Sequence, residues 1–372
     1  MRLTILKQFF HNTTLMFSSS SKLRQIKGDK AGRRWRMFHA TDFQSLMYPC
    51  FIFCRILGIF PYKINASSFE ISKPFYILST VITCVIGFYT LIVLYVLNNS
   101  EWFMIRTLRR TIELNAFYIF GSFIMVVTSV WVGPRMRLLQ TILRISSGLP
   151  LESYEKQSVL IHAKDIVGFF FLFVQLLFCF YNVQFYVMLK AFSFYITLIV
   201  FQMDMLYMNC VCVLKACFKR INDGLANLLV MNDESHLWVH HERRNPFLLM
   251  ELEALKKQHL IVNDTVQMLN MIFSPQLLAT VVITFVRLTF YLYFSLMLWE
   301  NSVHVHVYMN NLEKQVYYIF LMTSVAFYLI KIALVVWACE TGKDQANEIA
   351  IIIHNVFNST NDEQVKVEVI KK

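Results

Sequence analysis

The sequence predicts an all-α fold, a polytopic transmembrane helical bundle, on three observations. Of the 372 residues, 56% are apolar and only 16% are charged, whereas soluble proteins carry about 25% charged residues. The mean hydropathy is +0.49. Six separate stretches are each apolar over about 20 residues, the length at which a helix crosses a bilayer. This composition argues against a soluble enzyme and excludes disordered, collagen-like, coiled-coil and small disulfide-bonded proteins.

The six predicted spans cover approximately residues 75–97, 112–133, 166–189, 193–216, 276–298 and 316–338. We expect helices because lipid cannot hydrogen-bond an exposed backbone, and the runs are too continuously apolar for the strands of a membrane barrel. The run at 43–60 is interrupted by Pro49, Arg55 and Gly58, which favours an interfacial or re-entrant helix. The polar stretch 218–275 is expected to continue the fourth and fifth helices into the cytoplasm, with a loop near 232–246.

Lys and Arg residues predict the orientation of the bundle. Twenty-seven of the 35 lie on one side of the spans, and five lie on the other: Arg106, Arg109, Arg110, Lys190 and Lys314. Cytoplasmic loops carry the excess of positive charge, so we expect a cytoplasmic N-terminus. The net charge of +11 therefore orients the chain in the lipid bilayer, and no nucleic-acid partner is expected. The expected organisation is a basic tail (1–42), a transmembrane domain (43–358) and a C-terminal tail (359–372).

Motifs of catalysis and metal binding are missing from the sequence. It contains no GxGxxG, Walker A, HExxH or GxSxG pattern, so we expect neither an enzyme nor a cofactor. The eight cysteines fit no zinc or haem spacing and are expected to be reduced. The histidines in HLWVHH and HVH are expected to be solvated loop residues; for HVH, weak metal binding or pH sensing is the alternative.

Polar side chains within the spans define a candidate site. Several recur at helical spacing, so each set shares one helix face. Such faces either join neighbouring helices by hydrogen bonds or, at their outer ends, line a cavity for a small polar or amphipathic ligand. The predicted ligand-binding residues are Tyr118, Asn182, Tyr186, Tyr195, Tyr291 and Tyr317. For Tyr186 and Tyr317, which lie near span ends, an aromatic belt at the membrane surface is the alternative.

Two opposite charges lie about 11 residues into their spans, near mid-membrane: Asp204 in the fourth and Arg287 in the fifth. An isolated charge at this depth is costly, and pairing lowers the cost. We therefore expect an intramembrane ion pair between Asp204 and Arg287, direct or through water. The alternative is that each extends to the surface or meets another polar partner.

Four stretches, taken in order, carry a family resemblance: SLMYPCFIFCRILGIFPYKI, CVLKACFKRINDGLANL, LKKQHLIVNDTVQMLNMIFSPQLLATVVITF and ACETGKDQANEIAIIIHNVFN. They resemble the insect gustatory receptors over residues 43–358, with Ile221 and Asn222 at a recurrent Ile-Asn position and Phe273–Gln276 at the start of the fifth helix. The resemblance implies a receptor of seven helices, related to the odorant receptors, with a cytoplasmic N-terminus. It also implies a tetrameric ligand-gated cation channel, homomeric or heteromeric, with an extracellular-facing pocket and a pore lined by the seventh helices.

The chain departs from the family pattern at its C-terminal end, where VKVEVIKK replaces a seventh apolar span with its Thr-Tyr-five-apolar-Gln-Phe signature. We expect either a shortened sequence or a degenerate receptor that keeps a ligand pocket without forming a pore by itself. The expected role is a gustatory receptor subunit that detects small tastant molecules at the plasma membrane of chemosensory neurons.

Three other classes of function remain as alternatives. A G-protein-coupled receptor requires an external N-terminus, which the charge distribution opposes. A small-molecule transporter is typically built from inverted repeats and broken helices, whereas Gly87, Gly121 and Gly168 are scattered and no repeat is visible. A membrane-embedded enzyme requires paired catalytic groups, and none is found.

Overall fold

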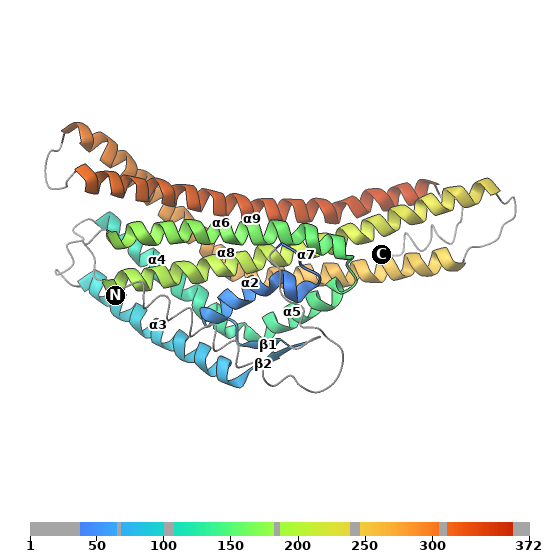
Figure 1. The fold of residues 1–372 in the computed structure, drawn as a ribbon, viewed down its shortest axis with the longest axis horizontal. Coiled ribbons are helices and arrows are strands. Elements are labelled where there is room, and N and C mark those ends of the chain that lie inside the picture. The colour runs from blue at the N-terminus through green and yellow to red at the C-terminus, as the bar shows by residue number, and fades with distance from the viewer. Residues whose placement is uncertain are drawn as a thin grey trace. The chain divides into compact units, whose positions relative to one another are not determined.

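The computed structural model describes residues 38–64, 68–99, 108–181, 187–238, 246–304 and 311–359. The fold is an all-α bundle with one short hairpin (Figure 1). Its elements in chain order are α2 (Phe43–Ile56), β1 (Tyr62–Ile64), β2 (Phe69–Ile71), α3 (Lys73–Asn99), α4 (Leu108–Val130), α5 (Val132–Ser146), α6 (Leu151–Tyr181), α7 (Val187–Trp238), α8 (Pro246–His304) and α9 (Asn311–Ser359).

Six helices of the described ranges, α3, α4, α6, α7, α8 and α9, are long and apolar enough to cross a bilayer. The predicted polytopic helical bundle with six spans is therefore confirmed. Two boundaries differ from the expectation. The third span does not reach residue 189, because α6 ends at Tyr181 and residues from Val187 already belong to α7. The second span ends at Val130, since a break at Trp131 separates α4 from α5.

Three of these helices are much longer than a membrane crossing requires. α7 has 52 residues, α8 has 59 and α9 has 49. At about 1.5 Å per residue each exceeds 70 Å, more than twice a hydrocarbon core of about 30 Å. α7 continues to Trp238 and α8 begins at Pro246, so the expected extension of the fourth and fifth helices through 218–275 is confirmed. The loop expected at 232–246 begins too early, because residues 232–238 still belong to α7.

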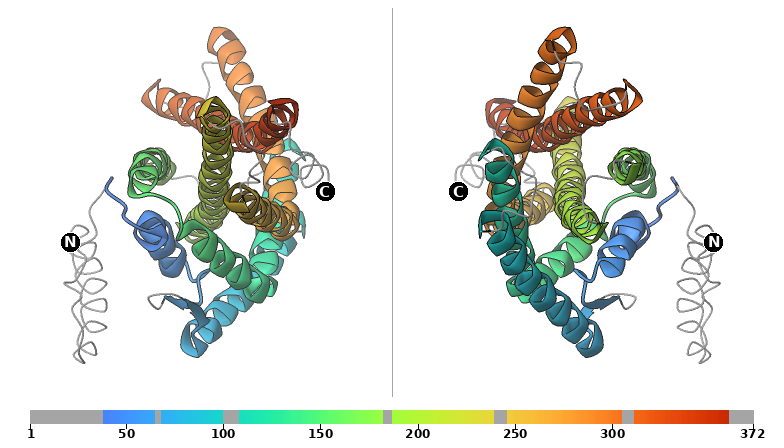
Figure 2. Two further views of the ribbon diagram at one scale, coloured as in Figure 1. Left: turned by 90° about the vertical axis from the view of Figure 1, so that its right-hand side faces the viewer. Right: turned by 90° about the vertical axis from the view of Figure 1, so that its left-hand side faces the viewer.

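Helix α7 forms the centre of the bundle. In its most apolar window, 83% of the residues are buried, against 17% in α3, and it contacts α2, α4, α5, α6, α8 and α9. Figure 2 looks along the bundle and shows α7, in yellow-green, surrounded by the other helices. Close approach to α7 requires glycine on its neighbours: a Cβ at Gly121 of α4 would lie 2.4 Å from Ile196, and one at Gly168 of α6 would lie 2.3 Å from Phe201.

Before the first span, a short helix packs against α6 and α7. Helix α2 begins with a capping box, in which the Asp42 carboxylate accepts from the Ser45 amide at 2.8 Å and the Ser45 hydroxyl oxygen accepts from the Asp42 amide at 3.0 Å. Phe43, Met47 and Cys50 point into the core. A helix is thus present where the sequence predicted an interfacial or re-entrant one.

The β1–β2 hairpin is not predicted by the sequence reading. Its antiparallel register pairs Tyr62 with Ile71. The buried Tyr62 hydroxyl donates to the Val132 carbonyl at 2.7 Å, which joins the hairpin to the start of α5. Burial raises the pKa of Tyr62 to about 12, because the charged phenolate would lose its hydration there.

Candidate ligand-binding site

A cavity of about 120 Å³ lies among the helices at one end of the bundle. It lies where α4, α7 and α9 begin and where α6 and α8 approach their ends. One water needs roughly 10–15 Å³ of such volume, and an engineered cavity of about 150 Å³ accepts benzene, so a single-ring organic molecule is the appropriate scale. The lining residues come from five helices: Arg110, Leu114, Tyr118, Phe178, Leu189, Lys190, Ser193, Arg287, Tyr291, Val316, Tyr317 and Phe320.

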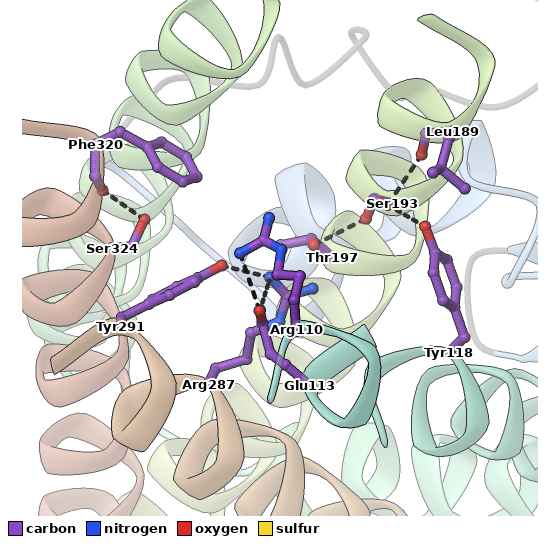
Figure 3. Close-up of polar contacts among 10 residues, drawn as sticks. All are labelled: Arg110, Glu113, Tyr118, Leu189, Ser193, Thr197, Arg287, Tyr291, Phe320 and Ser324. Atoms are coloured by element: carbon purple, nitrogen blue, oxygen red, sulfur yellow. Dashed lines mark hydrogen bonds and ion pairs between the residues drawn. The ribbon is translucent and has the colours of Figure 1, made fainter. Parts of the chain in front are cut away.

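A buried carboxylate joins two arginines at this cavity (Figure 3). Glu113 of α4 has no exposed surface, and its Oε2 lies 3.0 Å from Arg110 Nη1. Its Oε1 lies 3.1 Å from Nη1 of Arg287, whose side chain is 10% exposed. Charge in a low-dielectric site is tolerated only when it is paired. The bridge therefore ties the N-terminal part of α4 to α8 and holds both guanidinium groups beside the cavity.

Aromatic rings surround Arg287. Its guanidinium lies over the Phe117 ring at 4.0 Å from the centroid, and its Nη1 donates a hydrogen bond to the Tyr291 hydroxyl. The Tyr291 ring is also within 6.2 Å of Phe320 of α9. Cation–π contacts strengthen when both groups are removed from water. The result is a rigid wall in which α4, α8 and α9 each supply a side chain.

A second polar contact connects α4 to α7. The hydroxyls of Tyr118 and Ser193 are 2.6 Å apart, and the Ser193 hydroxyl donates to the Leu189 carbonyl at 2.9 Å. With the Ser193 proton so engaged, Tyr118 is the donor to Ser193, and the phenol oxygen retains its capacity to accept. The Tyr118 ring stacks on Phe192 at 5.5 Å and 10°, which holds the hydroxyl at the cavity wall.

The structure brings three of the six predicted ligand-binding residues to one cavity: Tyr118, Tyr291 and Tyr317. Tyr195 lies elsewhere, because its hydroxyl donates to the Leu57 carbonyl at 2.8 Å and joins α7 to the end of α2. Asn182 and Tyr186 lie outside the described residues. That these tyrosines bind a ligand stays a prediction.

The expected pair between Asp204 and Arg287 is corrected to two separate pairs. Asp204 Oδ2 lies 3.1 Å from Lys331 Nζ of α9, and both side chains are at most 4% exposed. Thr280 of α8 also donates to Asp204 Oδ1 at 3.1 Å. Arg287 instead forms its ion pair with Glu113 of α4. The physical reason is the direction of each side chain around its helix: Asp204 on α7 faces α8 and α9, whereas Arg287 on α8 faces α4.

Sequence reasoning missed Glu113, Arg110, Lys190 and Ser193 as members of the site. Arg110 and Glu113 are three residues apart, the spacing at which opposite charges meet on one helix face, so this pair carried a detectable signal. Lys190 and Ser193 share a helix face for the same reason, but only the tertiary arrangement places that face opposite α4. Over the described parts of the chain, no group of three metal-ligating side chains occurs.

Comparison with known families gives one extended match. Residues 47–371 match the family described as 7tm Chemosensory receptor. No curated protein matches the chain. The match covers the span-bearing region and includes the residues around the cavity, and the six apolar helices agree with a multi-pass membrane receptor. The chain therefore belongs to the 7tm chemosensory receptor family.

Proposed function

We propose that the chain is a gustatory-type receptor subunit in which a small tastant binds the cavity between α4, α7, α8 and α9 and favours the open state of a cation channel. The observation that carries this proposal is the cavity itself, walled by helices from distant parts of the sequence and carrying polar groups among aromatic rings. Ligand sites in helical bundles combine such apolar walls with a few fixed polar groups. Family membership supports a chemosensory role.

The proposed orientation places the cavity on the extracellular side. It lies at the end where α3 ends and α4 begins, and the excess of Lys and Arg lies in the segments that connect the opposite ends of the spans. By the positive-inside rule that opposite end is cytoplasmic. A tastant would then reach the cavity from outside the cell, and the receptor would lie in the plasma membrane of a chemosensory neuron.

Helix continuity supports a route from the cavity to the channel. α7, α8 and α9 all contribute cavity residues and then continue as unbroken helices far past the hydrocarbon thickness. A ligand shifts a conformational equilibrium only by its difference in affinity between the states. A tastant that bridges α4 and α9 more tightly in one arrangement would therefore shift helices that also meet far from the cavity, where Asn222 of α7 bonds Gln345 of α9 and Gly224 of α7 lies beside Leu255 of α8. The proposed assembly is a tetramer, with related subunits contributing to the pore.

Calcium imaging or electrophysiology of cells that co-express the chain with related subunits tests this function against a panel of tastants. Leu189 lines the cavity and is 7% exposed, whereas the preceding Met188 is 75% exposed. Leu189→Trp fills the cavity and should abolish or shift the response at unchanged surface expression. Met188→Trp adds the same bulk away from the cavity and should leave the concentration dependence unchanged. Equal responses of the two variants would contradict the proposed site.

A further inference from the structure

A buried arginine lies at the junction of α4 and α5, outside the cavity wall. The side chain of Arg135 of α5 is 1% exposed. Its Nη1 donates a hydrogen bond at 3.2 Å to the carbonyl of Thr128, in the last turn of α4. Its guanidinium lies over the Phe273 ring of α8, 5.7 Å from the centroid. An arginine stays protonated in a protein, so this junction carries a full positive charge inside the core.

This charge is not balanced by a carboxylate among the residues that the structure describes. The ionisable groups that act on it are a phenol and two thiols: Tyr62 of β1, Cys54 of α2 and Cys210 of α7. Phenols and thiols are uncharged at neutral pH, and burial lowers the pKa of Arg135. The buried cations Arg287 and Lys331, by contrast, each meet an acid at 3.1 Å. A buried charge without a counter-charge is strongly destabilising, so Arg135 requires a negative partner.

The contacts that Arg135 makes supply only part of that partner. The Thr128 carbonyl belongs to the C-terminal end of α4, where the helix dipole provides a partial negative charge. The Phe273 ring provides a cation–π attraction, which is weaker than an ion pair. Neither contact satisfies Arg135 Nε, which is buried and has no hydrogen-bond partner in the described part of the chain.

The residue that Arg135 contacts carries a second unsatisfied donor. The Thr128 hydroxyl is buried and also lacks a hydrogen-bond partner among the described residues. Threonines of α3 instead donate to the carbonyl four residues earlier, as Thr83 and Thr90 do. Buried polar atoms without a partner require an explanation, such as a bound ion or water. Two such donors, on residues in direct contact and beside an unbalanced cation, indicate an anion.

We propose that Arg135 and Thr128 bind a chloride ion, which accepts hydrogen bonds from Arg135 Nε and the Thr128 hydroxyl and supplies the missing negative charge. One guanidinium matches one monovalent ion. Burial selects a small ion over a carboxylate or a phosphate, because Arg135, Thr128 and Phe273 are at most 2% exposed. Arg135 lies in the segment expected on the cytoplasmic side, so the ion would come from the cytosol. This inference does not depend on the tastant site.

Anion exchange tests the proposal on the full chain, purified in detergent. We would compare sodium chloride with sodium gluconate at equal ionic strength, which keeps the screening of surface charges constant. The Tm should be higher in chloride and should reach a plateau as chloride replaces gluconate, because a ligand of the folded state stabilises it by mass action. Broadening of the chloride NMR signal should report binding over the same range of concentration.

Arg135→Met removes the charge and keeps the length of the side chain. It should abolish both the chloride dependence of the Tm and the specific line broadening. In gluconate this variant should melt at least as high as the wild type, which then carries an unbalanced buried charge, and in chloride it should melt lower than the wild type. Arg137→Met is the matched control, because Arg137 lies on the same helix and is exposed; it should keep the chloride dependence.

Thr128→Val removes the hydroxyl, keeps the shape of the side chain and leaves the arginine in place. It should weaken chloride binding about tenfold, since it deletes one hydrogen bond to a charged group. Thr128→Ser keeps the hydroxyl and should keep the affinity. This pair carries the comparison if Arg135→Met does not yield a folded, monodisperse protein.

Three results would overturn the inference. Equal Tm values in chloride and gluconate, with an unbroadened chloride signal, would mean that no anion binds and that water satisfies the two donors. An equal loss of Tm for Arg135→Met in both salts would mean that the arginine acts only as a cap of α4. Chloride stabilisation that survives both Arg135→Met and Thr128→Val would place the ion elsewhere on the chain.

Discussion

Removal of the Glu113 carboxylate should destabilise the bundle more than any surface charge change. Glu113 has no exposed surface and contacts Arg110 and Arg287 at 3.0 and 3.1 Å. Glu113→Gln keeps the shape of the side chain and removes its charge, which takes from the buried Arg287 the acid that it contacts. Loss of one partner from a buried ion pair costs about 3–5 kcal/mol. For a chain of this size we expect Tm to fall by about 5 °C or more.

The assay is thermal unfolding of the purified variants in one detergent, and the loss of the monodisperse peak reports unfolding. Glu152→Gln is the control: its pair with Lys156 at 2.7 Å is 76% and 74% exposed, and solvent screens it, so Tm should not change measurably. A double variant, Glu113→Gln with Arg287→Gln, should recover part of the loss, with a coupling of about 1–3 kcal/mol. Simple addition of the two single effects would refute the bridge.

Two further perturbations test the interior of the bundle. Lys331→Met leaves the fully buried Asp204 without its ammonium partner at 3.1 Å, and this should lower the free energy of unfolding by about 3–5 kcal/mol. Thermal melting checks this, and the double variant Lys331→Met/Asp204→Leu should recover stability. A single variant that melts at the same temperature as the wild type would contradict the pair. Gly168→Ala places a Cβ 2.3 Å from the buried Phe201 ring and should lower the free energy of unfolding by about 1–3 kcal/mol. Gly87→Ala, with open space around it, should be neutral or stabilising. A lower Tm for Gly87→Ala than for Gly168→Ala would argue against the α6–α7 contact.

The helices could be predicted from the sequence because lipid imposes one solution on each long apolar run. The runs that became α3, α8 and α9 needed no tertiary information. Helix α5 was not predicted, since its residues are amphipathic and their apolar face is explained only by burial of Leu138, Leu139 and Ile142 in the core. The hairpin was missed for a related reason: strands of three residues carry too little pattern to be recognised.

The site was only half predictable. Position along a span gives approximate depth, so Asp204 and Arg287 were correctly recognised as buried charges. Their partners depend on which helices adjoin and on the rotation of each helix about its axis. α4 packs against α8 and α7 packs against α9, and these contacts select Glu113 for Arg287 and Lys331 for Asp204. No spacing in the sequence contains that information.

Thiol labelling at the cavity tests the central proposal, a ligand site open to the outside of the cell, most directly. Ser193 lines the cavity, and Ser147 is exposed at the junction of α5 and α6, towards the opposite end. In intact cells, Ser193→Cys should react with an impermeant anionic methanethiosulfonate reagent and be protected by an activating tastant, while Ser147→Cys should react only after permeabilisation. Reaction of Ser147→Cys in intact cells, with Ser193→Cys inaccessible until the membrane is opened, would contradict both the orientation and the proposed route of the ligand.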